Sequence, residues 1–476
     1  MSSGFVTSRY NFYVPVVDGA LLYSANTGAV LRLTGAHSLV LARELSGRKK
    51  AISRECVPAG VFEQLRRGGF VVSKNARELS QIRRRYRRAR KQTPLVLTLT
   101  TTMDCNLGCY YCYEERSKDQ LKLEDVEAVV NLVRERVRRS GKRSIHVDWY
   151  GGEPLMNLAF IEAASLALQS FCQRNQIHYA ASVISNGTCW PESVGPFIER
   201  HRIRQVQISF DGLRKSHDRR RRFRTGYKPE KDASSFDSAV VLVDQLLNYT
   251  HVDVRLNIDR DNQDDVVPFI DFARERGWFN RSFPAVLQPA RLSSYSEHSS
   301  FMRKAELTLE EYDRIRAIVR EHAAGETPVE ESETPDGFPF PKTSVCAALA
   351  NDSIVVGADG RHYHCGLQAA EPNRAVGTIH PPPKRQLPVL NSFAGPTKSD
   401  EGWWRDFDPT TLPTCSRCSF LPICWGGCPK KHLEGDQHAI SEQSQYWRQN
   451  LPRLIAAGVG ATADSNYVFT ENDQFR

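Results

Sequence analysis

The stretch LVLTLTTTMDCNLGCYYCY, residues 95–113, decides the fold of this chain. Its start is apolar and rich in β-prone residues, which is typical of a buried strand. The strand runs directly into a loop with three cysteines, Cys105, Cys109 and Cys112. A structural zinc site has four protein ligands, whereas an iron–sulfur cluster held by three cysteines leaves one iron open to another molecule. The loop therefore predicts a cluster with a reactive iron.

Further apolar runs follow this strand, and amphipathic helical patterns separate them. Strands that alternate with helices favour parallel βαβ units in an α/β protein. Six such units predict a partial (β/α)6 TIM-like barrel with its active site at the C-terminal strand ends, although periodicity alone leaves a doubly wound sheet open. The expected strands are residues 95–101, 144–150, 179–185, 205–210, 252–258 and 285–288.

Three more loops at predicted strand ends carry glycine and polar residues. They are GGEP at residues 151–154, SNGT at 185–188 and SFDG at 209–212. Two glycines let the backbone approach a ligand, and Glu153 can accept hydrogen bonds from an ammonium group. A plain β-to-α turn is the alternative for the GGEP segment.

Together with the cysteine loop, these loops resemble those of the radical S-adenosylmethionine (SAM) superfamily. The resemblance implies that the amino and carboxylate groups of SAM chelate the open iron of a [4Fe-4S] cluster. It also implies that Ser209 and an arginine near Arg221 hold the SAM ribose or carboxylate. The cofactor-binding residues would be Tyr111, Gly151, Gly152, Glu153, Pro154, Asn186, Ser209, Asp211 and Arg221.

The C-terminal part contains six more cysteines in a long and specific pattern. It resembles the SPASM extension of radical SAM enzymes, whose seven cysteines hold two auxiliary iron–sulfur clusters, and a zinc ribbon is the alternative. By this resemblance one auxiliary cluster would be bound by Cys346, Cys365 and Cys428, and the other by Cys415, Cys418 and Cys424.

No cysteine follows Cys428, so the second auxiliary cluster lacks its usual last thiolate. A carboxylate or imidazole can ligate iron and shift its potential. Asp436 is the first choice for this ligand, followed by Glu442, with His432 and His438 as further candidates. The first auxiliary cluster can likewise have an open position. The other cysteines, Cys56, Cys172 and Cys189, are expected to be plain buried thiols.

The first eighty residues combine short β-rich runs, a hairpin signal at Asp18-Gly19 and helical patterns at residues 35–45 and 59–67. They resemble the small winged-helix precursor-recognition domain of peptide-modifying enzymes, and a purely structural N-terminal domain is the alternative. The expected divisions are residues 1–80 for this domain, 81–94 for a basic linker, 95–325 for the barrel, 343–450 for the cluster domain and 451–476 for a tail.

The composition describes a folded, soluble chain of 476 residues with a formal net charge of +9. Its apolar runs are too short for a membrane span, and its start lacks the features of a secretory signal. A cytoplasmic, reducing location is therefore expected, in which cysteines bind metal rather than form disulfides. Arginine blocks at residues 83–91 and 219–224 indicate a solvated face, with an acidic peptide or nucleic-acid partner as the alternative.

The resemblance implies an enzyme that cleaves SAM to a 5′-deoxyadenosyl radical, which abstracts hydrogen from carbon. With a recognition domain, it would oxidatively modify, and cross-link, side chains of a ribosomally made precursor peptide. Reduced ferredoxin or flavodoxin would donate the electron, and neither a membrane nor nucleic acid is expected as a partner. Sulfatase-maturing relatives have an aspartate base directly after the second SPASM cysteine, where this chain has Gly366. Such a maturase is the enzyme alternative, and a peptide- or nucleic-acid-binding scaffold with a cluster or zinc is the non-enzyme alternative.

Overall fold

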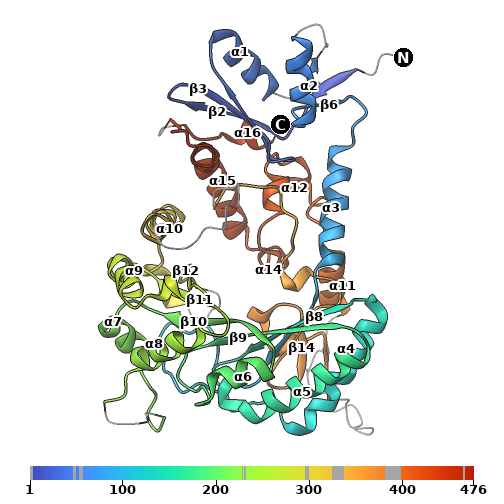
Figure 1. Ribbon diagram of the computed structural model, residues 1–476. Helices are drawn as coiled ribbons and strands as arrows, with labels where there is room; N and C mark the ends of the chain where they lie inside the picture. Colours follow the sequence, from blue (N-terminus) through green and yellow to red (C-terminus); the bar gives the residue numbers. More distant parts are fainter. Residues whose placement is uncertain are drawn as a thin grey trace. The chain divides into compact units, whose positions relative to one another are not determined.

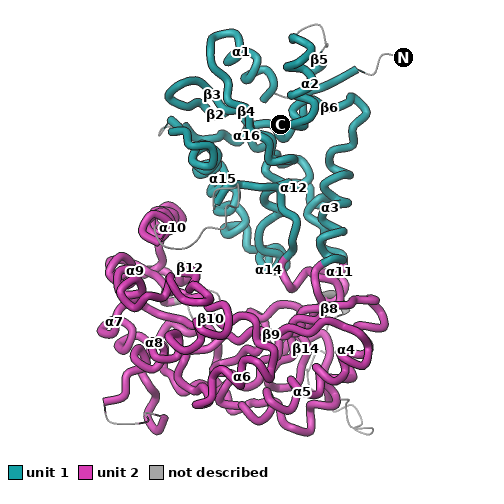
Figure 2. Tube along the Cα trace, viewed as in Figure 1, with its two compact units in different colours: residues 1–92, 330–345, 406–476 teal, residues 93–329, 346–405 magenta. Residues whose placement is uncertain are grey.

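The computed structural model describes residues 4–46, 50–52, 57–227, 229, 232–294, 300–323, 337–369, 371–380, 398–464 and 467–475. The chain forms two compact units (Figure 2). Unit 1 combines residues 1–92, 330–345 and 406–476, and unit 2 combines residues 93–329 and 346–405. Unit 1 is therefore assembled from both ends of the chain. The five-part division expected from the sequence stays a prediction.

Unit 2 is built on one sheet with the strand order β12-β11-β10-β9-β8-β7-β13-β14-β15 (Figure 1). From β7 to β12 every strand is parallel to its neighbour, and the order follows the chain without a reversal. A doubly wound sheet reverses its order at a switch point, so this arrangement is of the barrel type. The six strands are β7 (Leu95–Thr100), β8 (Ser144–Tyr150), β9 (His178–Ser185), β10 (Ile203–Phe210), β11 (His251–Ile258) and β12 (Val286–Arg291).

The predicted partial barrel is thus confirmed as a barrel-like parallel sheet, and five of the six predicted strands agree with the structure within two residues. The sixth, expected at residues 285–288, runs on to Arg291. On the other side of β7, the sheet continues through β13 (Ile354–Val356), β14 (Arg361–Tyr363) and β15 (Gly377–Thr378). Strand β13 is parallel to β7, and the last two pairings are antiparallel.

Each strand has one apolar face and one polar face, as β8 illustrates. Ile145, Val147 and Trp149 are fully buried, whereas the alternate residues are only partly buried. Because side chains alternate across a strand, one face packs into the core and the other stays available for polar groups. The core side is covered by α4 (Val126–Ser140), α5 (Leu158–Arg174), α6 (Val194–Arg200), α8 (Ser235–Leu246) and α9 (Val266–Glu275). The unit also contains α7 (Arg214–Arg220), α10 (Leu309–Ala323) and most of α11 (Lys398–Asp406).

One helical stretch, Pro154–Arg174, is long and apolar enough to cross a membrane by length and composition. It contains α5, whose residues Phe160, Ile161, Ala164 and Leu168 belong to the hydrophobic core of unit 2. The apolar character of this stretch is therefore explained by its packing against the sheet.

The N-terminal part of unit 1 contains two small antiparallel sheets, β5-β1-β6 and β2-β3-β4. Leu22, Leu45, Phe62, Leu65 and Phe70 form a core between their strands and two helices. Both predicted helices are present, and the winged-helix resemblance itself stays a prediction. The elements are β1 (Phe5–Thr7), β2 (Asn11–Val16), β3 (Gly19–Ser24), β4 (Val30–Leu33), α1 (Ala36–Leu45), β5 (Ala51–Ile52), α2 (Ala59–Arg67) and β6 (Val71–Ser73).

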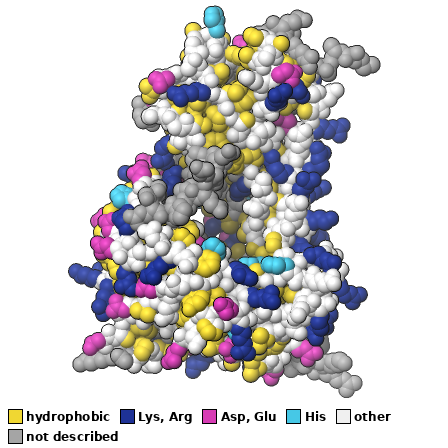
Figure 3. Space-filling model, viewed as in Figure 1, with side chains coloured by type: hydrophobic (Ala, Val, Ile, Leu, Met, Phe, Trp, Pro, Cys, Tyr) yellow, Lys and Arg dark blue, Asp and Glu magenta, His cyan; other side chains and the backbone are white. Residues whose placement is uncertain are grey.

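The first arginine block lies on α3 (Glu78–Gln92), where Lys and Arg side chains gather on the surface (Figure 3). Several of these arginines bind the segment 407–410 of the same unit. Arg83 donates to Thr410 Oγ1 at 2.7 Å, and Arg83 and Arg87 pair with Asp408 at 3.8 and 3.7 Å. Arg90 donates to the carbonyl oxygen of Phe407 at 3.0 Å. The block thus anchors the chain that leads into the C-terminal cysteines.

The C-terminal residues of unit 1 are also packed in place. The ring of Phe12 stacks on Phe420 with centroids 5.2 Å apart and lies 4.9 Å from the ring of Phe469. Residues 451–476, expected as a tail, therefore contribute to the core of this unit. The helices of this part are α12 (Pro413–Arg417), α13 (Leu421–Cys424), α14 (Pro429–Leu433), α15 (Gln437–Ala457) and α16 (Glu471–Gln474).

Candidate active site

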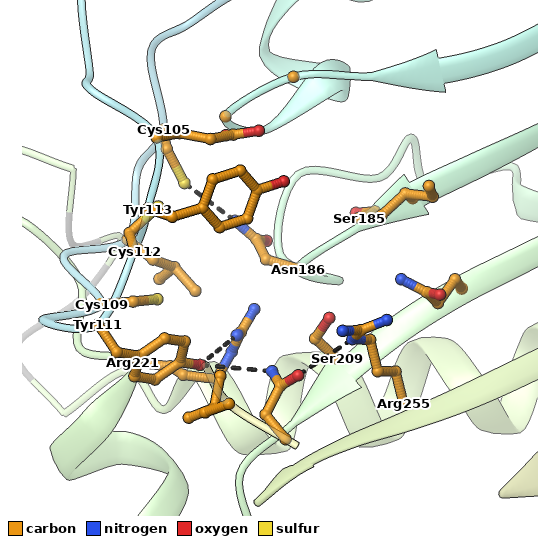
Figure 4. Close-up of a pocket in the computed structure, with 18 of the residues that line it drawn as sticks. Cys105, Cys109, Tyr111, Cys112, Tyr113, Ser185, Asn186, Ser209, Arg221 and Arg255 are labelled. Carbon is orange, nitrogen blue, oxygen red and sulfur yellow. Dashed lines mark hydrogen bonds between the residues drawn. The ribbon is translucent and has the colours of Figure 1, made fainter. Parts of the chain in front are cut away.

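A pocket of about 390 Å³ opens at the C-terminal ends of the parallel strands in unit 2. Cys105, Cys109 and Cys112 lie along one wall, and Ser209 and Arg255 lie on the opposite side (Figure 4). Burial raises the pKa of Cys105 to about 12 and that of Cys112 to about 11. Bound iron would reverse this preference, because it would hold each thiol as the thiolate. Three partly buried thiols on one pocket wall therefore fit the predicted cluster.

In the part of the chain that the structure describes, no three Cys, His, Asp or Glu side chains are grouped around a position for one metal ion. The cysteines of an iron–sulfur cluster ligate different irons, so they do not need to converge on a single point.

The cysteine loop is held by the second arginine block, which follows β10. Arg224 donates to the carbonyl oxygen of Cys105 at 2.6 Å and pairs with Asp104 at 2.5 Å. The backbone N–H of Gly108 donates to the carbonyl oxygen of Arg222 at 2.7 Å. This block therefore has an internal structural role in unit 2.

The two glycines of the GGEP segment allow it to approach the cysteine loop. A Cβ atom on Gly151 would lie 2.4 Å from the carbonyl oxygen of Thr102, and one on Gly152 would lie 2.4 Å from that of Asp104. The N–H of Gly152 donates to the Thr102 carbonyl at 2.9 Å. Both glycines line the pocket, and any side chain there would push the two loops apart.

Glu153 is fully buried and binds the next loop of the site. Its Oε1 accepts from Ser185 Oγ at 2.9 Å, and its Oε2 accepts from the N–H of Asn186 at 2.7 Å. Burial raises the pKa of Glu153 to about 7, against the effect of these hydrogen bonds. Glu153 and Pro154 lie outside the pocket lining, so their expected contact with SAM stays a prediction.

Asn186 connects the SNGT loop to the cysteine loop. Its Nδ2 donates to Asn106 Oδ1 at 2.8 Å and lies 3.6 Å from Cys105 Sγ. Asn186 also lines the pocket, so its hydrogen bonds connect the pocket wall formed by the cysteine loop to the end of β9.

Tyr111, Asp211 and Arg221 form one buried hydrogen-bond network. The Tyr111 hydroxyl donates to Asp211 Oδ1 at 2.7 Å and accepts from Arg221 Nη1 at 2.8 Å. Arg221 also lies 3.6 Å from Asp211. Tyr111, Ser209 and Arg221 line the pocket, whereas Asp211 supports it from outside the lining.

Sequence reasoning missed Arg255, which lies on β11 beside Ser209 of β10 and lines the pocket. Among the described residues its single hydrogen bond is from Nε to Asn257 Oδ1, at 3.1 Å, and it has no ion pair. The alternation of Asp253, Arg255 and Asn257 with apolar residues could have indicated a polar inward face of this strand. Gln207, Tyr113 and Tyr150 also line the pocket and were not predicted.

Cys415, Cys418 and Cys424 lie together in unit 1. Burial raises the pKa of both Cys415 and Cys418 to about 12, and the nearby thiol of Cys424 adds to the rise. Ser419 Oγ and Trp425 Nε1 in this segment are buried polar atoms without a hydrogen-bond partner. The sulfur atoms of an iron–sulfur cluster accept hydrogen bonds, and these two donors could bond to them. The three thiols and the two unpaired donors therefore fit the predicted second auxiliary cluster.

Asp436, the expected fourth ligand, is used differently in the structure. Its Oδ1 accepts from the N–H of Ala439 at 3.0 Å and caps α15, and its Oδ2 pairs with Lys431 at 3.0 Å. His432 lies near Cys415, because a Cβ atom on Gly426 would lie 3.5 Å from His432 Nε2 and 3.6 Å from Cys415 Sγ. Its Nε2 is 2.7 Å from the carbonyl oxygen of Gly426. The ligand role of Asp436 stays a prediction, and both of its oxygens already have partners.

The ligands expected for the first auxiliary cluster come from both units. Cys346 and Cys365 belong to unit 2, and Cys428 belongs to unit 1, so this ligand set also stays a prediction. Of the cysteines expected to be plain thiols, Cys172 is buried and Cys189 is partly buried. Cys56 lies outside the described residues.

Comparison with known proteins finds relatives of this chain among peptide- and sulfatase-maturing proteins. Over 237 residues the chain is 24% identical to the sporulation killing factor maturation protein SkfB of Bacillus subtilis, covering 49% of this chain and 51% of that protein. Over 338 residues it is 27% identical to the serine-type anaerobic sulfatase-maturating enzyme of Klebsiella pneumoniae, covering 68% and 79%. The matches to the first curated relatives span only 35% to 51% of their lengths.

Among solved structures, native anSMEcpe with bound AdoMet superimposes with a TM-score of 0.56 at 18% identity. The match covers 77% of this chain and 100% of that chain, and it shows a shared fold. Residues 99–283, which contain the cysteine loop and the strand-end loops around the pocket, match the radical SAM superfamily.

Proposed function

We propose that this chain is a radical SAM enzyme that oxidatively modifies, and cross-links, side chains of a ribosomally made precursor peptide. The observation that carries the proposal is the pocket that joins Cys105, Cys109 and Cys112 to the loops after β8, β9 and β10. When bound, the [4Fe-4S] cluster and SAM supply a 5′-deoxyadenosyl radical that abstracts hydrogen from carbon.

The residues of the chain bind and orient the cofactor. Ser209 and Arg221 offer a hydroxyl and a guanidinium for the ribose or carboxylate of SAM, and Gly151 and Gly152 leave room for close backbone approach. Tyr111 fixes Arg221 through its hydroxyl. A pocket held by such a network is preorganised, so less ordering is needed when SAM binds.

The precursor peptide is expected to bind the N-terminal part of unit 1 by adding a strand to a sheet edge. The outer edge of β2 is bridged by the chain itself, because Val16 pairs with Ala463. In this sheet β4 is the other edge strand, and four residues of backbone are available there. SkfB, named for maturing a killing factor, is a relative that supports a peptide substrate.

Auxiliary clusters bound by the C-terminal cysteines would supply a route for the electron that leaves the oxidised substrate. Cys346, Cys365 and Cys428 would hold one cluster, and Cys415, Cys418 and Cys424 the other, with His432 now ahead of Asp436 as the non-cysteine ligand. Reduced ferredoxin or flavodoxin would donate the electron that starts the reaction, in the cytoplasm.

Maturation of a sulfatase is the second candidate, because the Klebsiella relative is named for that reaction. In sulfatase-maturing enzymes the resemblance places an aspartate base where this chain has Gly366. Gly366 begins a short helical turn, Gly366–Gln368, and cannot accept a proton. We therefore place peptide cross-linking first.

Replacing Cys105, Cys109 and Cys112 together by alanine tests the proposal. We expect complete loss of 5′-deoxyadenosine formation under reducing conditions, while the C-terminal cysteines still retain iron. Anaerobic reconstitution, iron and sulfide analysis and chromatography of the products measure both. Cys189→Ala is the matched control, since this thiol lies close to the site but outside the pocket lining, and it should cleave SAM normally. Normal deoxyadenosine formation by the triple variant would refute the radical SAM assignment.

A further inference from the structure

Arg220 is a fully buried arginine beneath the cysteine loop, and the proposed function gives it no role. It ends α7 with 1% of its surface exposed. Asp211 and Asp259, which follow β10 and β11, are both 0% exposed and face its guanidinium. A buried charge is costly unless it is paired, so this arrangement requires each partner to be present.

The guanidinium of Arg220 is paired through all of its nitrogens. Nε donates to Asp211 Oδ2 at 2.9 Å. Nη2 and Nη1 donate to the two oxygens of Asp259, at 2.7 and 3.2 Å, in the bidentate geometry of an arginine–carboxylate pair. Lysine has a single ammonium group and cannot reproduce this fork.

Arg220 also reaches the cysteine loop itself. Its Nη1 donates to the Tyr110 hydroxyl at 2.9 Å. The guanidinium carbon lies 5.4 Å from the ring centre of Tyr110 and 5.3 Å from that of Tyr111. Tyr110 and Tyr111 are the two residues between Cys109 and Cys112. One side chain thus supports the middle of the loop that carries the thiols.

Within the buried ion-pair network of Arg220, the charges balance. Arg220 and Arg221 carry two positive charges, and Asp211 and Asp259 carry two negative charges. Removing Arg220 leaves one uncompensated carboxylate close to the cluster loop. Net charge near a cluster is one of the factors that set its potential, and an added negative charge opposes the gain of an electron.

From this geometry we propose that Arg220 is a positioning residue that fixes the cysteine loop and, through charge balance, sets the reduction potential of the cluster on it. The inference rests on the proposed function, because it assigns a role toward the SAM-binding cluster. Its two central residues, Arg220 and Asp259, do not line the pocket.

The test uses the full-length protein with reconstituted clusters. The midpoint potential of the SAM-binding cluster is measured by a dithionite titration followed by EPR, using the signal that changes when SAM is added. We expect a more negative potential for Arg220→Met. The double variant Arg220→Met/Asp259→Asn restores neutrality and should return the potential toward the wild-type value. Exposed Arg219 provides the matched control, and Arg219→Met should leave the potential unchanged.

Arg220→Lys separates charge from geometry. It keeps the positive charge without the fork, so its potential should stay near the wild-type value while its iron occupancy falls. If Arg220→Met does not fold, this variant and the neutral double variant still decide the question. The proposal is overturned if the double variant has a potential shifted as far as that of a folded Arg220→Met. If Arg220→Met does not fold, a double-variant potential that differs from the wild-type value overturns it. It is also overturned if Arg220→Lys matches the wild type in both potential and iron occupancy. A wild-type protein without any SAM-responsive signal would instead refute the proposed function.

Discussion

At the scale of single residues, two arginines that line the pocket differ in how many partners they have. Arg221 is paired with Tyr111 and Asp211, whereas Arg255 donates one hydrogen bond to Asn257 and has no ion pair among the described residues. A partly buried guanidinium whose two terminal nitrogens have no partner can bind a carboxylate through two parallel hydrogen bonds. In the proposed function, SAM would bring one carboxylate into this pocket.

We therefore expect Arg255→Gln to weaken SAM binding by about tenfold, which corresponds to about 1.4 kcal/mol. Decarboxylated SAM should bind the wild type and the variant equally, because it lacks the group that Arg255 would hold. Equilibrium dialysis with the reconstituted, unreduced protein measures both ligands. If the variant loses the same affinity for both, Arg255 does not recognise the carboxylate. Arg219, which is exposed and outside the lining, gives Arg219→Gln as a control.

At the scale of secondary structure elements, an aspartate after Cys428 can either cap a helix or ligate iron. Asp436 caps α15 through the N–H of Ala439, and this hydrogen bond together with Lys431 lowers the pKa of its carboxyl. The capping contribution is present above the usual carboxyl pKa and is lost as the pH falls through the lowered value. The same residue was expected to ligate iron.

Asp436→Ala should destabilise unit 1 by about 1 kcal/mol through loss of the cap and should leave the iron content unchanged. His432→Ala should instead lower the iron bound by Cys415, Cys418 and Cys424. Thermal unfolding and iron analysis, performed in the Cys105, Cys109 and Cys112 triple variant, separate the two effects. Loss of iron from Asp436→Ala with unchanged stability would return Asp436 to the role of ligand.

At the scale of the whole molecule, peptide recognition and radical chemistry are assigned to different units. The N-terminal strands belong to unit 1, and the pocket belongs to unit 2. Deleting the N-terminal strands would also remove Phe12 from its contacts with Phe420 and Phe469, so loss of function after deletion would be ambiguous. Changes confined to the edge strand β4 give a sharper test.

Leu31→Pro and Arg32→Pro each remove one N–H from β4. Consecutive N–H groups point to opposite edges of a strand, so one of the two variants blocks the outer edge only. We expect that variant to fold, to cleave SAM without peptide at the wild-type rate and to lose at least tenfold in affinity for the precursor peptide. Arg32→Ala keeps the N–H and should bind normally. Unchanged affinity of both folded proline variants would exclude strand addition at β4.

Local pattern was enough to predict the parallel barrel and the cysteine loop. The strand repeats are buried on one face, and the thiols are adjacent in sequence, so their grouping needs no long-range information. The sequence also identified Tyr111, Asn186, Ser209 and Arg221, because loops at the C-terminal ends of parallel strands meet at one edge of the sheet.

Only the tertiary structure decided the roles that depend on distant partners. Arg220 and Arg221 are neighbours in one basic run, yet one pairs beneath the loop with Asp259 from another strand end and the other faces the pocket. The arginines of α3 bind residues more than 300 positions away, which no local pattern can reveal. Sequence by itself therefore determined the parallel sheet and the grouping of three thiols in one loop, whereas tertiary contacts decided which charges are neutralised and which remain available for a ligand.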